Sequence, residues 1–80
     1  MNRQLKMVWD FRGPDALKTA EHHEIHLKEY IQKEHLQATT GFIEQNDLHA
    51  FAFMIINEKD MLKVRDELIP HRAFWHESED

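Results

Sequence analysis

The sequence contains no cysteine, which excludes disulfide bonds, thiolate metal sites and thiol catalysis. Its only glycines are Gly13 and Gly41, so it lacks the glycine-rich loop of a phosphate-binding site. No apolar run approaches the roughly 20 residues that cross a membrane, and the first residues lack the features of a signal peptide. We therefore expect a cytoplasmic protein without a membrane partner.

Basic residues are outnumbered in this chain: 10 Lys and Arg stand against 15 Asp and Glu, and the formal net charge is −5. This balance argues against a nucleic-acid partner, because such proteins usually carry a basic face. With 80 residues, of which 41% are hydrophobic, the chain is expected to form a single domain over positions 1–80. A chain of this length buries only about 60% of its unfolded surface, so we expect a second subunit to support its core.

Apolar residues recur with the period of a strand or of a helix in six successive segments. Residues 4–11 alternate between apolar and mixed positions, which predicts a strand with one buried face. Gly41 is a candidate β-bulge in the second strand, and Asn57 is a candidate cap of a second helix that Pro70 ends. In full, the pattern predicts strands over residues 4–11, 37–45, 48–56 and 71–77, and helices over residues 14–35 and between Asn57 and Pro70.

The order βαββαβ predicts an α+β, ferredoxin-like fold, with a four-stranded antiparallel sheet and two helices on one of its faces. The third strand is apolar on both sides, since Phe51, Phe53 and Ile55 alternate with Ala52 and Met54. The side that the helices leave bare would be an exposed apolar surface, which typically marks an interaction site. The sequence therefore predicts a homodimer in which two sheets pack face to face around a two-fold axis.

The stretch EHHEIH, from Glu21 to His26, concentrates three histidines and two glutamates in six residues. Two histidines four apart on one helix face, with a glutamate after the first, bind zinc in metalloproteases, but HEIH is one residue short of that spacing. His22 and His26 are four apart, yet the helical wheel turns His22 toward solvent, and zinc needs a third protein ligand. We therefore predict no metal site and no organic cofactor.

The same helix also allows an acid–base interpretation. Thr19, His23, His26 and Tyr30 form a polar stripe at one edge of its apolar face. A partly buried imidazole near a carboxylate or a phenol is equipped for proton transfer near neutral pH. The candidate catalytic residues are therefore His23, His26 and, from the first strand, Asp10. In the alternative interpretation, His23 is a helix-edge histidine whose hydrogen bonds serve only the fold.

Aromatic side chains would line a cavity at the predicted dimer interface. His49 shares a strand face with Phe51 and Phe53 and is a candidate polar group in an otherwise apolar pocket. Arg72 carries a guanidinium that can hold a ligand carboxylate through two hydrogen bonds. Alternatively, His49 is a satisfied strand-edge residue, Arg72 is solvated and the aromatic residues form the core. The candidate ligand-binding residues are Trp9, Tyr30, His49, Phe51, Phe53 and Arg72.

The order of the elements, with HHEIHLKEYI in the first helix and Gly41-Phe42 in the second strand, resembles the YciI-related and EthD-like branches of the dimeric α/β-barrel superfamily. His26-Leu27 fits the histidine, often followed by leucine, that those proteins carry on their first helix. LIPHRAFW is similar to the muconolactone-isomerase-like branch, whose second helix ends at a proline before a short strand. The resemblance implies a homodimeric barrel that binds small, mostly aromatic or apolar molecules, commonly without a cofactor.

Two functions follow from these features. In the first, the protein binds a small apolar or amphipathic molecule in a cavity between the two sheets of the dimer. In the second, it is a cofactor-free enzyme of isomerase, lyase or monooxygenase type that uses a first-helix histidine as general acid and base. A third reading is a structural dimer that partners another protein.

Overall fold

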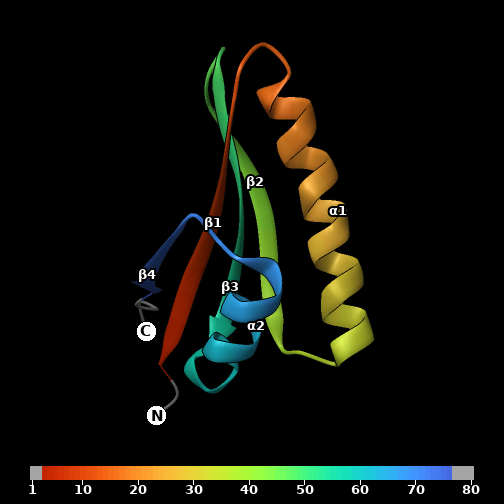
Figure 1. The fold of residues 1–80 in the computed structure, drawn as a ribbon, viewed down its shortest axis with the longest axis vertical. Helices are drawn as coiled ribbons and strands as arrows, with labels where there is room; N and C mark the ends of the chain where they lie inside the picture. Colours follow the sequence, from red (N-terminus) through yellow and green to blue (C-terminus); the bar gives the residue numbers. More distant parts are fainter. Residues whose placement is uncertain (1–2, 77–80) are drawn as a thin grey trace.

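One four-stranded antiparallel sheet, covered on one face by two helices, organises the computed structural model, which describes residues 3–76 (Figure 1). This confirms the predicted α+β architecture and is consistent with a ferredoxin-like βαββαβ fold. The strands are β1 (Gln4–Arg12), β2 (Ala38–Asn46), β3 (His49–Asn57) and β4 (Arg72–His76), and the helical segments are α1 (Ala16–Glu34), the 3₁₀ turn η1 (Glu58–Asp60) and α2 (Met61–Leu68). Position 77, the last of the predicted final strand, lies outside the described residues.

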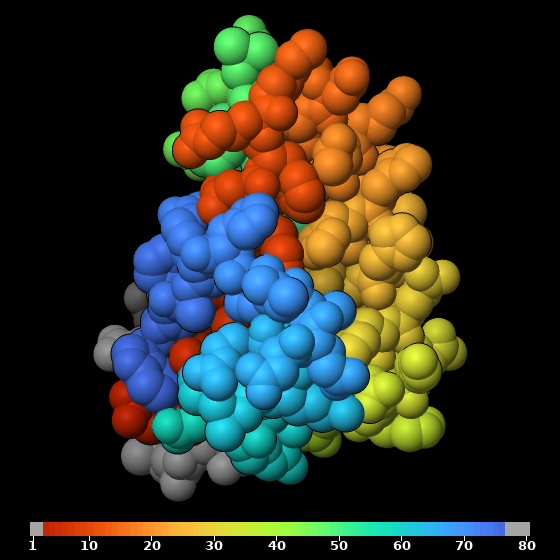
Figure 2. All heavy atoms as spheres, in the orientation of Figure 1, coloured from red at the N-terminus to blue at the C-terminus, as the bar shows by residue number. Residues whose placement is uncertain are grey.

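The strands lie in the order β2-β3-β1-β4, and every neighbouring pair is antiparallel. β1 and β3 therefore occupy the centre of the sheet, as expected for the two most apolar strands. In the space-filling view, the first half of β1 is visible only in patches, between α2 and β4 and below β4 (Figure 2). No helix among residues 3–76 is long and apolar enough to cross a membrane.

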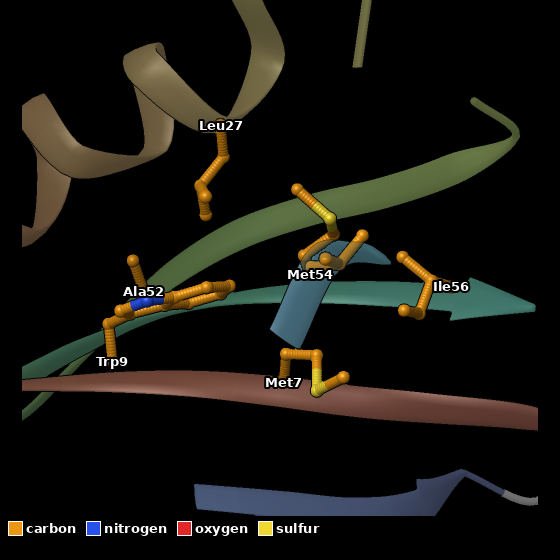
Figure 3. Close-up of a cluster of buried hydrophobic side chains, with 7 residues drawn as sticks. Met7, Trp9, Leu27, Ala52, Met54 and Ile56 are labelled. Atoms are coloured by element: carbon orange, nitrogen blue, oxygen red, sulfur yellow. The ribbon is translucent and has the colours of Figure 1, made fainter. Parts of the chain in front are cut away.

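The core lies between the helices and one face of the sheet. In the register of β1 and β3, Trp9 lies opposite Ala52 and Met7 lies opposite Met54, so their side chains emerge on the same face. Leu27 extends from α1 toward this layer (Figure 3). The largest fully buried members of the cluster are Met7, Leu27, Met54, Ile56 and Val64 of α2. Fully burying such a side chain stabilises the fold by about 1.5–3 kcal/mol.

The second helix begins later than the sequence pattern predicts. Asn57 makes no side-chain capping bond, because it is the last residue of β3, where it pairs with Gln4 and is buried. The 3₁₀ turn intervenes, and α2 begins at Met61. The helix ends at Leu68, two residues before Pro70, with Ile69 in a left-handed conformation at φ 45°.

Gly41 is not a bulge, in contrast to the prediction. It lies in regular register opposite Phe53, and the irregularity in β2 falls between Glu44 and Asn46. Glycine at position 41 leaves room for a neighbouring ring instead: a Cβ there would lie 2.5 Å from Cζ of Phe53, so a larger residue would have to displace that ring. The outer end of the Phe53 ring therefore lies close to the backbone of β2, on the side of the sheet that faces away from the helices.

Candidate functional site

The face of the sheet opposite the helices carries both apolar and charged side chains, and we name it the open face. Alternation along the strands defines its members. Ile43 and Phe74 are 42% and 47% exposed, whereas Phe51, Phe53 and Ile55 are half-buried. The central part of the open face comprises Lys6, Val8, Asp10, Thr39, Gly41, Ile43, His49, Phe51, Phe53, Ile55, Arg72 and Phe74, and the register adds Gln4, Arg12 and His76 at its ends.

Asp10 is the centre of a polar cluster on the open face. Arg72 donates two hydrogen bonds to its carboxylate, from Nε to Oδ2 and from Nη2 to Oδ1, each 2.8 Å long. Nε2 of His49 lies 2.9 Å from Oδ1 of the same carboxylate. The side chains of Asp10 and His49 are each only 16% exposed, while that of Arg72 is 46% exposed. The cluster therefore joins three strands, β1, β3 and β4, at one point.

The electrostatics of the cluster favour an ionised Asp10. Burial raises the pKa of this carboxyl, but the hydrogen bonds and positive charges of Arg72 and His49 together outweigh burial and lower it. An ionised carboxylate only accepts hydrogen bonds, so Nε2 of His49 donates to Oδ1 of Asp10, and this bond fixes the orientation of the ring. A histidine held by a carboxylate in this way can accept and return a proton.

His71 supports the cluster from the backbone. Its Nδ1 accepts a hydrogen bond of 2.8 Å from the amide of Asp10, and its own amide donates to the carbonyl of Val8 at 2.9 Å. Because a backbone N–H only donates, Nδ1 of His71 carries no proton here. The imidazole thus continues the ladder between β1 and β4 by one further bond, beyond the last strand pair, Val8 and Arg72. This bond holds Arg72 beside Asp10.

A hollow of about 420 Å³ lies beside the polar cluster. Its apolar wall is formed by Val8, Phe51 and Phe74, and its polar wall by Lys6, Gln45, His49 and Arg72. The ammonium of Lys6 lies 4.4 Å from the ring centroid of Phe53, and the guanidinium carbon of Arg72 lies 5.5 Å from that of Phe74. An apolar wall with a few converging polar groups is typical of a small-molecule site.

Five of the residues singled out in the sequence meet on the open face: Asp10, His49, Phe51, Phe53 and Arg72. Four others lie on the helix side of the sheet instead: Trp9, His23, His26 and Tyr30. The structure therefore separates Asp10 from the helix histidines with which it was grouped. The sheet itself stands between them.

His23 lies between α1 and the sheet. Its ring centroid is 5.1 Å from that of Trp9 and 5.4 Å from that of Phe11. Its Nε2 is buried and has no hydrogen-bond partner among residues 3–76. Burial, followed by the charges of His26 and His71, lowers the pKa of His23, so the ring favours its neutral form. His23 therefore packs among core aromatic rings, and its buried Nε2 lacks the hydrogen bond that the structural alternative predicts.

The remaining helix-side candidates also have contacts that serve the fold. The His26 side chain is 74% exposed, and its Nδ1 lies 3.2 Å from Oε1 of Glu29. The Tyr30 hydroxyl donates to Glu67 at 2.5 Å and so connects α1 with α2. Burial and this bond raise the pKa of Tyr30 to about 12.

Trp9, proposed as a ligand contact, is instead part of the core and is 3% exposed. Its Nε1 donates to the carbonyl of Leu68 at 2.8 Å, which joins β1 to the end of α2.

The stretch EHHEIH forms the outer side of α1, apart from two residues. Glu24 is buried and accepts a hydrogen bond of 3.0 Å from the hydroxyl of Thr40, and His23 packs inward as described. His22 is exposed, as the helical wheel predicts. Among residues 3–76, no group of three or more His, Asp or Glu side chains is arranged to hold a metal ion.

Sequence reasoning missed five residues of the site: Lys6, Val8, Gln45, His71 and Phe74. The alternation that placed Asp10 opposite Trp9 also assigns Lys6 to the open face, and the same period along β4 joins Phe74 to Arg72. No sequence signal identifies His71, because its role depends on a contact with a residue 61 positions away.

No protein-family model matches the chain, and no curated protein and no solved structure matches it. The likeness to the dimeric α/β-barrel superfamily therefore rests on the order of the elements and on the short segments that suggested it.

Proposed function

We propose that this chain is a binding module that holds a small apolar or amphipathic molecule on the open face, enclosed by the open face of a second copy. The observation that carries the proposal is the hollow of about 420 Å³ between the Phe51 and Phe74 side chains and the Asp10 cluster. Phe51 and Phe53 would contact the apolar body of the ligand, and His49 and Arg72 would contact its polar atoms.

The exposed apolar residues support a second copy as the cover. Ile43 and Phe74 are each more than 40% exposed, beside the half-buried rings of Phe51 and Phe53. From strand spacing and rise, the open face measures roughly 30 Å by 19 Å, so two copies would bury on the order of 1,100 Å². This area is near the lower end of stable interfaces. Such a pair would have the homodimeric α/β-barrel arrangement of the superfamily that the sequence resembles.

A native mass spectrum of the freshly purified protein tests both parts of this proposal. We expect a species of twice 9.7 kDa, with additional mass from any retained ligand. Ile43→Glu should shift it to 9.7 kDa, because a carboxylate introduced on the open face would be desolvated without a partner in the interface. Ile25→Glu is the matched control, since Ile25 is 50% exposed on the outer side of α1. A ligand-free wild type of 9.7 kDa at micromolar concentration would refute the proposal.

A second candidate function, a cofactor-free enzyme of isomerase or lyase type, is favoured by one contact. Nε2 of His49 lies 2.9 Å from Oδ1 of Asp10, so His49 replaces the first-helix histidines as candidate acid and base. Removing a general acid or base typically costs about 10²–10⁴-fold in rate. His49→Gln should therefore abolish any turnover found with carbon-acid substrates while leaving the dimer intact, and His22→Gln should leave the rate unchanged. Equal rates for His49→Gln and wild type would exclude this chemistry.

A further inference from the structure

The charges of the open face do not balance. The carboxylate of Asp10 is already occupied by Arg72 and His49. Lys6 lines the same hollow, and its ammonium makes no ion pair among residues 3–76. The open face of a chain with a net charge of −5 therefore carries at least one uncompensated positive charge.

The position of Lys6 directs this charge into the site. Lys6 lies on the central strand β1, between Ile55 of β3 and Phe74 of β4. Its ammonium lies 4.4 Å from the ring centroid of Phe53 and 5.8 Å from that of Phe51. The cation is thus held over the aromatic rings by their negative faces instead of extending into solvent.

A second copy on the open face would make this charge unfavourable. Removing an ammonium from water without an opposite charge is strongly disfavoured. Asp10 is the only acidic side chain of the open face, and both of the Arg72 nitrogens Nε and Nη2 bind it. The missing negative charge must therefore come from the bound molecule.

We propose that the ligand is a small organic anion with a ring-containing apolar body, whose anionic group pairs with Lys6 while its ring packs on Phe51 and Phe74. This inference rests on the proposed binding function and adds the charge of the ligand. Aromatic side chains favour a planar partner through offset or edge contacts. A charged hydrogen bond to an ammonium selects an anion over a neutral molecule of the same shape.

Two fluorescent probes with the same aromatic body separate charge from shape. Anilinonaphthalene sulfonate is anionic and N-phenylnaphthylamine is neutral, and each is titrated into the full chain. Lys6→Met keeps the aliphatic part of the side chain. It should lower the affinity for the sulfonate probe about tenfold, which is the effect of one lost charged contact. The affinity for the neutral probe should change by less than about twofold. Lys18→Met makes the same charge change on the exposed side of α1 and should leave both affinities unchanged.

Salt provides a second measurement on the unmodified chain. Raising the salt concentration screens exposed charges. It should therefore lower the affinity for the sulfonate probe and leave the affinity for the neutral probe unchanged. If Lys6→Met and salt affect both probes equally, or affect neither, the ligand is not selected by its charge and this inference fails, although the binding face stands. If neither probe binds the wild type, the proposed binding function itself fails.

Discussion

The guanidinium of Arg72 and the carboxylate of Asp10 form two hydrogen bonds of 2.8 Å across 62 positions of the sequence. The pair connects the edge strand β4 to the central strand β1 on the open face. It also fixes the carboxylate that His49 contacts. The geometry of the site and the attachment of the last strand therefore depend on the same two residues.

Replacing Arg72 by Gln should lower the free energy of unfolding by about 1 kcal/mol, because a doubly hydrogen-bonded partner is lost from a largely buried carboxylate while the guanidinium is half hydrated. Urea unfolding measures this value. Arg65→Gln is the matched control, since the Arg65 guanidinium pairs, within residues 3–76, with the exposed Asp66 at 3.3 Å. It should cost less than about 0.5 kcal/mol. Equal losses for the two variants would show that the Arg72 pair adds nothing beyond an ordinary surface contact.

Stability should also decrease in acid through Asp10. The pKa of Asp10 is lowered from its ordinary value of 3.8 in the folded chain, so the unfolded chain takes up the proton first as the pH falls. The stabilisation is therefore complete above the unfolded value and is lost as the pH falls through the folded value. The free energy of unfolding should be measured from about pH 6 to pH 2. The difference in this free energy between wild type and Asp10→Asn should become smaller as the pH falls through this range. A constant gap would contradict the lowered pKa.

His23 should produce a separate loss of stability as the pH falls, in a pH range above that of Asp10. Its pKa is lowered from 6.5 by burial, then by His26 and His71, so the unfolded chain is protonated before the folded chain. The stabilisation from the neutral ring is complete above the unfolded value and declines as the pH falls below it. In His23→Leu, which has no titratable group at this position, the decline between about pH 7.5 and pH 5 should be smaller. His22→Gln, at an exposed position, should keep the wild-type profile.

Gly41→Ala should displace the ring of Phe53, because the new Cβ would lie 2.5 Å from its Cζ. The ring is the end of a flexible side chain on the open face, so we expect a modest loss of about 1 kcal/mol. Ring-proton chemical shifts of Phe53 report the displacement. When Gly41→Ala is made in a Phe53→Leu background, the loss of unfolding free energy should be smaller. The difference between the two losses, taken as a double-mutant cycle, measures the contact between position 41 and the Phe53 ring. Additive losses would mean that the ring and Gly41 do not interact.

The amino-acid sequence by itself determined which residues share a face within each element. The period of two along residues 4–11 separates Trp9 from Asp10, and that along residues 48–56 joins His49 to Phe51. These assignments follow from local backbone geometry, which needs no knowledge of distant residues. The number, type and order of the elements follow from the same periods, together with the turn and helix signals around Gly13, Pro14 and Pro70.

Only the tertiary structure decided which of these faces meet. Strand register places Arg72 and His49 on Asp10, and it depends on the packing of β1 against two strands that are distant in the sequence. The sheet separates His23 from Asp10 because α1 packs on the face that carries Trp9. Helical periodicity gives the angle of His23 around α1 but not the side of the sheet on which α1 lies. Burial of the larger apolar surface selects that side, and this selection leaves the polar cluster on the open face.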